Sequence, residues 1–165
     1  MRFAMYQNKS DKGRGRGIRY LLLSIFIMVI IFIHSAMPAD LSSAESGWIV
    51  SLIRQLTGID SELTTFLVRK TAHFLEYLFL GISLAQTFRY SGKSGNRFFR
   101  KNGIPGVLTR QGAFSAAAIG CIYAVTDEIH QYFVAGRSCE IRDLCIDAAG
   151  VVCGCLVVFI KKPVA

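Results

Sequence analysis

The stretch YLLLSIFIMVIIFIHSAM, residues 20–37, decides the fold class of this chain. It contains no aspartate, glutamate, lysine or arginine. As an α-helix that rises about 1.5 Å per residue, it reaches about 27 Å, which is close to the hydrocarbon thickness of a bilayer. The stretch is therefore predicted to be a membrane-spanning helix.

The composition of the whole chain agrees with this interpretation. Of its 165 residues, 52% are hydrophobic and 18% are charged, so a disordered chain is excluded. A disulfide scaffold is disfavoured because Cys121, Cys153 and Cys155 lie inside apolar runs. The net charge of +8 comes from basic segments that lie between apolar stretches. This distribution indicates how a chain is oriented in a membrane, so we expect no nucleic-acid partner.

Three further stretches favour membrane helices, namely residues 71–88, 107–126 and 143–160. Each is mostly apolar but carries charged or ionisable residues near one end. Together with the first stretch they predict an all-α fold, an integral membrane four-helix antiparallel bundle. We expect residues 1–17 to form a basic cytoplasmic arm and residues 18–162 the membrane domain.

Loop charges predict the orientation of the bundle. Lysine and arginine dominate residues 1–19, 89–110 and 161–162, whereas the other loops carry more acids and fewer cations. By the positive-inside rule the protein is a multi-pass cell-membrane protein with cytoplasmic N- and C-termini. The alternative that the first stretch is a cleaved secretory signal would leave three spans in the same orientation.

Two connecting segments have their own character. Apolar residues at Trp48, Ile49, Leu52, Ile53 and Leu56 follow helical spacing, which predicts a short amphipathic helix between helices 1 and 2. It lies either at the outer membrane surface or on the outer end of the bundle. The basic, glycine-containing segment 91–106 predicts an inner loop that contacts anionic lipid headgroups.

Polar residues recur at helical spacing inside the predicted spans, where charges are costly. Antiparallel helices bring the start of span two, the end of span three and the start of span four to one depth. We therefore expect one polar pocket near the outer leaflet. His34, at the end of span one, is a further candidate member of this pocket. The candidate ligand-binding residues are His73, Glu76, Tyr77, Asp127, Glu128, His130, Gln131, Arg137, Asp143 and Asp147.

Several interpretations of this cluster stay open. It is either a functional pocket or a buried ion-pair network in which Arg69, Arg137 and Arg142 neutralise the acids. Histidine beside carboxylates also permits acid–base chemistry or binding of a divalent ion. The spacing of these residues alone is weak evidence for either. We therefore expect no metal and no cofactor, and we assign no catalytic residue. Cys139 and Cys145 near the oxidising face either pair or stay free.

The motifs resemble those of the VanZ-like family, small bacterial four-helix membrane proteins named after a teicoplanin-resistance protein. The resemblance rests on K-x-x-H-x-x-E-Y at residues 70–77, D-E-x-H-Q at 127–131, G-R at 136–137 and D-x-x-x-D-x-x-G at 143–150. It covers roughly residues 18–160. The cysteines of the fourth predicted helix have no family role that we assign.

The resemblance implies a cell-envelope protein associated with low-level resistance to teicoplanin and related lipoglycopeptides, in a family without an agreed biochemical activity. We expect membrane lipids as partners, and a lipidated or lipid-linked ligand whose phosphate or carboxylate faces Arg137 and Arg142 at the outer leaflet. The alternatives are a membrane hydrolase or transferase acting on a lipid phosphate, and a small proton-coupled transporter. The step Gly150-x-x-x-Gly154 favours close helix approach, so a homo-oligomer also stays open.

Overall fold

The structure, a computed structural model, describes residues 2–38, 47, 49–56, 58, 61–91 and 108–161, with side chains from residue 15 onward except at residue 61. Its long helices are α1 (Arg2–Ser35), α3 (Ser61–Ser91), α4 (Arg110–Tyr132) and α5 (Ile141–Ile160). Residues 49–56 form a further short helical segment, and the described residues contain no strand. The predicted all-α class is confirmed.

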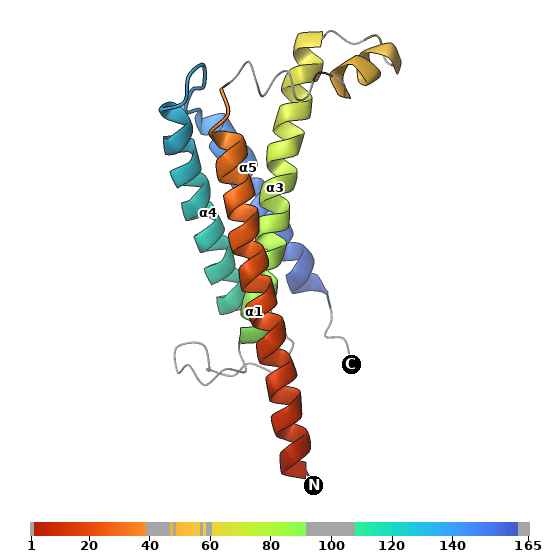
Figure 1. The fold of residues 1–165 in the computed structure, drawn as a ribbon, viewed down its shortest axis with the longest axis vertical. Coiled ribbons are helices and arrows are strands. Elements are labelled where there is room, and N and C mark those ends of the chain that lie inside the picture. Colours follow the sequence, from red (N-terminus) through yellow and green to blue (C-terminus); the bar gives the residue numbers. More distant parts are fainter. Residues whose placement is uncertain are drawn as a thin grey trace.

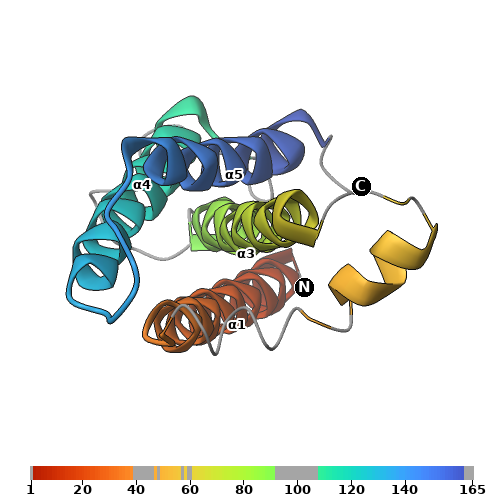
Figure 2. The same ribbon diagram turned by 90° about the horizontal axis from the view of Figure 1, so that it is seen from above.

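The four long helices lie side by side in an antiparallel arrangement, with α1 and α4 running in one direction and α3 and α5 in the other (Figure 1). Seen from above, α3 lies between α1 and α5, and it also contacts α4 (Figure 2). We call the end of the bundle where α1 and α4 finish and α5 begins the site end. The first turns of α3 extend past it.

Close contact between α3 and α5 depends on glycine. A Cβ atom added to Gly154 would lie 2.2 Å from the Leu78 carbonyl oxygen, and one added to Gly81 would lie 2.3 Å from the Val151 carbonyl oxygen. Only residues without a side chain allow two helix backbones to approach this closely. The predicted small-residue step of α5 therefore packs on α3 of the same chain, and this face is not free for a second copy.

Two of the four long helices are apolar and long enough to cross a membrane by themselves, at Gly15–Ser35 and Ile141–Ile160. Within the described residues α3 and α4 do not pass this test, because ionisable residues such as Lys70, Glu76 and Asp127 reduce their hydropathy. The helices thus indicate a membrane protein. They support fewer independent spans than the four predicted from the sequence.

The connecting segments are described only in part. In residues 49–56, Leu52 and Leu56 are 50% and 77% exposed, and the segment lies beside the long helices in Figure 2. The predicted arm at residues 1–17 is continuous with α1 from Arg2, because that helix begins there. Trp48 and residues 92–106 of the predicted lipid-contacting loop lie outside the described residues.

Candidate functional site

Three helices each bring one potential ligand side chain to the site end. His73 of α3, Asp127 of α4 and Asp147 of α5 offer donor atoms that all lie within 4.8 Å of one another. Asp127 is 3% exposed and Asp147 1% exposed, and Tyr77, one turn after His73, is fully buried. The antiparallel packing therefore unites residues that are far apart in the sequence. We call His73, Tyr77, Asp127 and Asp147 the buried cluster.

The end of α1 is bonded to this cluster through Asp127. The Ser35 hydroxyl donates a hydrogen bond of 2.8 Å to Asp127 Oδ2, and the Gln131 amide donates one of 3.1 Å to the same oxygen. Both donors are buried. These bonds fix the carboxylate of Asp127 and leave its second oxygen directed elsewhere.

Two neighbouring acids are already paired. Lys70 donates to Asp143 across α3 and α5, and His34 Nδ1 lies 2.5 Å from Glu76 Oε1 across α1 and α3. The third contact of this type is longer, with His73 Nδ1 3.8 Å from Asp147 Oδ1. Ion pairs thus exist around Asp143 and Glu76, but their closest cations are Lys70 and His34. Of the three arginines considered from the sequence, Arg142 lies 3.8 Å from Asp143.

Several polar atoms of the site have no hydrogen-bond partner among the described residues. They include Asp127 Oδ1, Asp147 Oδ2, the Tyr77 hydroxyl and His130 Nε2, and all of them are buried. Buried polar groups in proteins are nearly always bonded, so each such atom needs an explanation. Asp127 Oδ1 and Asp147 Oδ2 belong to carboxylates of the buried cluster, and the Tyr77 hydroxyl lies within hydrogen-bonding reach of Asp127.

Arg137, one of the predicted site residues, lies at the end of α1. Its Nε donates to the Met37 carbonyl at 2.9 Å and its Nη2 to the His34 carbonyl at 3.1 Å, at the end of α1. A cation is favourable there because the last carbonyls of a helix lack partners and carry partial negative charge. Burial, and then the charge of Arg69, lower the pKa of Arg137, yet arginine stays protonated.

Other predicted site residues hold the loop between α4 and α5. Glu128 Oε2 accepts a hydrogen bond of 3.1 Å from the backbone N–H of Glu140, just before α5 begins. Gly136 adopts a φ of 71°, a left-handed conformation that favours glycine in this loop. Arg142 is exposed and pairs with Glu140 at 2.7 Å. Both arginines that were predicted to face a phosphate or carboxylate, Arg137 and Arg142, thus have protein partners.

His130, another predicted site residue, and the two cysteines Cys139 and Cys145 make no ion pair with a described residue. The His130 ring stacks on Phe32 of α1, with ring centroids 4.4 Å apart. Cys139 and Cys145, for which a disulfide was one of two alternatives, are both free and exposed. Their thiols therefore remain available to reagents.

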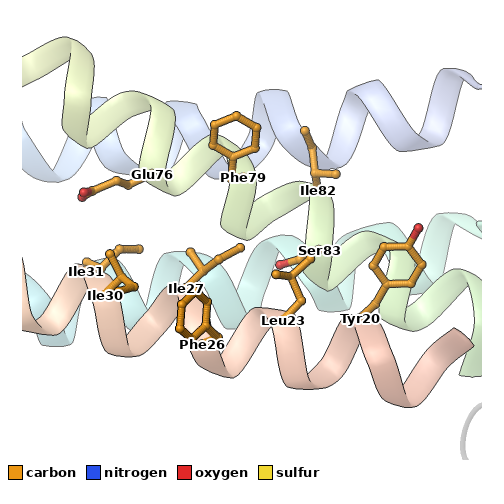
Figure 3. A pocket seen from close by; sticks show the side chains of 10 residues that line it. All are labelled: Tyr20, Leu23, Phe26, Ile27, Ile30, Ile31, Glu76, Phe79, Ile82 and Ser83. Carbon is orange, nitrogen blue, oxygen red and sulfur yellow. The ribbon is translucent and has the colours of Figure 1, made fainter. Parts of the chain in front are cut away.

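An apolar groove lies between α1 and α3 and has a volume of about 390 Å³. Figure 3 shows Glu76 and Ile31 near one end and Tyr20 at the other, with apolar side chains between them. We call it the α1–α3 groove. Its lining residues are Tyr20, Leu23, Phe26, Ile27, Ile30, Ile31, Glu76, Phe79, Ile82 and Ser83.

Comparison with known protein families agrees with this arrangement. A family model described as VanZ/LLP1 matches residues 20–162, which is most of the chain. The chain belongs to the VanZ-like family. No match to this VanZ-like chain is found among curated proteins or among solved structures. The resemblance seen in the motifs is therefore confirmed, and the match includes α3, α4, α5 and the part of α1 from residue 20 onward.

Sequence reasoning missed some residues that matter to the site of this VanZ-like protein. Ser35 was not predicted although it bonds Asp127, and its only signal was its place beside His34 at the end of the first apolar stretch. Lys70 was noted as part of a motif, but its pairing with Asp143 depends on helix rotation, which spacing within one helix does not determine. Arg69 lies near His73 and Arg137 and makes no ion pair with any described residue.

Proposed function

We propose that this protein is a multi-pass cell-membrane protein that binds an anionic amphiphile at the outer leaflet, and that it thereby contributes to low-level tolerance of lipidated glycopeptides such as teicoplanin. The observation that carries the proposal is the α1–α3 groove, which is apolar along its length and has Glu76 near one end. A site that is apolar along one side and polar at its end is complementary to a molecule with a chain and a headgroup.

The surface of the bundle supports a position inside the membrane for all four long helices. Large apolar side chains are exposed on each of them, for example Phe26 on α1, Phe79 on α3, Ile122 on α4 and Leu156 on α5. Soluble monomers rarely expose apolar surface on every side. Asp127, Glu128 and Gln131 of α4 are buried in the bundle interior, where a bilayer tolerates polar residues.

Charge places the site end outside the cell in this proposal. Arg89 at the end of α3 and Arg110 at the start of α4 lie at the opposite end of the bundle, together with the basic start of α1. Basic segments remain in the cytoplasm under the positive-inside rule. Since lipoglycopeptides act at the outer surface, a pocket at the site end would meet them there.

The groove has the dimensions of one leaflet. From Tyr20 to Ile31 the α1 helix advances about 16 Å, and half of a hydrocarbon core of about 30 Å is nearly the same length. Leu23, Phe26 and Phe79 line the groove and are also exposed, so its side is open to surrounding lipid. An acyl chain aligned with the helices would therefore enter laterally.

The headgroup would lie beyond Glu76, where cations are available. Arg69 and Arg137 are neighbours near His73, and Arg69 makes no ion pair with a described residue. Arg137 uses three of its five N–H groups on protein acceptors. Two closely placed guanidinium groups favour phosphate or carboxylate.

Native mass spectrometry and drug tolerance together test the proposal. The full chain is purified in mild detergent and examined for bound lipid, and the same chain is expressed in a susceptible bacterium that is challenged with teicoplanin and with a glycopeptide that has no acyl chain. We expect bound lipid and raised tolerance to teicoplanin alone. Ile27→Trp, which fills the groove, is expected to abolish both.

Val29→Trp provides the matched control, because Val29 is exposed on the same helix and does not line the groove. It should retain lipid and tolerance. Equal loss in both variants, or lipid retention by Ile27→Trp, would refute the groove as the binding site. Labelling of Cys139 in intact cells by a membrane-impermeant maleimide, absent in Cys139→Ser, tests the outward position of the site end.

A further inference from the structure

The buried cluster presents an electrostatic problem that its protein partners do not solve. Asp127 and Asp147 are almost fully buried, and their carboxylates lie within reach of the same imidazole. Two ionised carboxylates at this distance in a low-dielectric environment repel each other, and each also loses its hydration. A compensating positive charge is required if both are ionised.

The nearby lysine, arginines and histidine other than His73 make no ion pair with Asp127 or Asp147. Lys70 pairs with Asp143, and Arg137 donates to the carbonyl groups at the end of α1. His34 lies against Glu76. Arg69 is half-buried and influences His73, but it makes no ion pair with Asp127 or Asp147. No described side chain neutralises this pair of carboxylates completely.

Unused oxygen atoms in the cluster indicate where a ligand would lie. Asp127 Oδ1 and Asp147 Oδ2 have no hydrogen-bond partner, although the other oxygen of Asp127 accepts two. The Tyr77 hydroxyl is fully buried and lies within hydrogen-bonding reach of Asp127. Two unpartnered carboxylate oxygens, one from α4 and one from α5, thus lie beside the imidazole of α3.

We propose that His73, Asp127 and Asp147 bind a divalent transition-metal ion such as Zn²⁺ or Mn²⁺, with Tyr77 beside it. One imidazole and two carboxylates form a ligand set that these ions accept. The sequence had led us to expect no metal, because the spacing of histidine and carboxylates alone is a weak signal for one.

The distances leave room for an ion after a small adjustment. Donor atoms bound at about 2.1 Å lie about 3.4 Å apart in a tetrahedral site and about 4.2 Å apart when opposite in an octahedral one. The three donors here are within 4.8 Å of one another. A small movement of the Asp147 carboxylate and the His73 ring, which lie 3.8 Å apart at their nearest atoms, would close this difference. The bonds of Ser35 and Gln131 to Asp127 Oδ2 would stay in place.

The ligand set also leaves coordination positions open. Three protein ligands are typical of sites in which water or another ligand completes the shell. Gln131 and Ser35 bond the second oxygen of Asp127 and would orient it toward the ion. The proposal does not depend on amphiphile binding, because metal content is measured without any lipid or drug.

The test uses the full chain with Cys139→Ser, which removes one exposed thiol, purified without a chelator through a tag that contains no histidine. Metal content is measured by inductively coupled plasma mass spectrometry, and thermal unfolding is recorded before and after EDTA and after addition of Zn²⁺ or Mn²⁺. We expect about one ion per chain, a lower unfolding temperature in EDTA, and recovery with the metal.

Variants locate the ion. Asp147→Asn, Asp127→Asn and His73→Gln preserve shape and should bind the metal at least about tenfold more weakly and lose the EDTA response. Glu62→Gln is the matched control, since it removes a carboxylate that is exposed in the first turn of α3. Absence of metal together with no response to EDTA or added ions in the unmutated cluster would overturn the proposal, as would undiminished binding in Asp147→Asn and Asp127→Asn.

Discussion

Substitution of Gly154 by alanine tests the contact that determines the position of α5 on α3. The added Cβ would lie 2.2 Å from the Leu78 carbonyl oxygen and 2.8 Å from the Ile82 backbone nitrogen. Both are backbone atoms of α3, so no side-chain rotation relieves the overlap. The first contact needs about 1.2 Å more to reach the 3.4 Å at which ordinary van der Waals contact begins.

The magnitude follows from two opposing terms. Overpacking of a tight interface costs about 1–3 kcal/mol, while alanine gains up to about 1 kcal/mol over glycine in helix propensity. Because the overlap is with backbone atoms, the overpacking cost lies at the upper end of its range, and we expect Gly154→Ala to reduce the free energy of unfolding by about 2 kcal/mol. Because α3 and α5 must separate, His73 and Asp147 should also move apart, and the metal affinity of the proposed site should fall.

Thermal unfolding in detergent, followed by intrinsic fluorescence, measures the effect. Gly15→Ala is the control, since Gly15 lies in the helix α1 and nothing lies within 4 Å of a Cβ atom added there. This control gains propensity without overlap and should be as stable as the original chain or more stable. Unchanged stability of Gly154→Ala beside an unaffected Gly15→Ala would show that α3 and α5 do not touch as described.

Three other contacts give separate expectations. Lys70→Met should lower the unfolding temperature by leaving Asp143 without its cation, and the swap Lys70→Asp with Asp143→Lys should restore part of the loss in the same assay. Ser35→Ala removes one donor to the buried Asp127 and should cost about 1–2 kcal/mol, measured by unfolding, with an exposed Ser138→Ala as reference. Arg137→Lys cannot reproduce donation from Nε and Nη2 together, so hydrogen exchange of the loop before α5 should accelerate; unchanged exchange would contradict the bonding described here.

The meeting of distant polar residues could be predicted from the sequence, and the partner of each residue could not. Helical spacing, together with loop charges that alternate between basic and acidic, implied that His73, Asp127 and Asp147 share one depth, and the structure places them together. Depth alone does not determine helix rotation. The contacts of His34 with Glu76 and of Lys70 with Asp143 depend on rotation and were therefore not predicted.

The contacts of Arg137 and of the α5 glycines also could not be identified from the sequence. Arginine beside several acids suggested an anion-binding role, but the unbonded carbonyls at the end of α1 are acceptors that a sequence pattern does not display. The small-residue step at Gly150 and Gly154 predicted a close helix neighbour without saying which helix. Identifying α3 as that neighbour required the packing of the whole bundle.

The central position of α3 explains how one small bundle can carry two distinct features. Glu76 lines the α1–α3 groove, whereas His73 and Tyr77 belong to the buried cluster with α4 and α5. Because successive residues of a helix are rotated by about 100°, neighbours in sequence serve different sides. Filling the groove with Ile27→Trp should therefore leave metal content unchanged, and Asp147→Asn should leave bound lipid in place. If each change abolished both properties, the two sites would be a single one, with the headgroup itself a ligand of the ion.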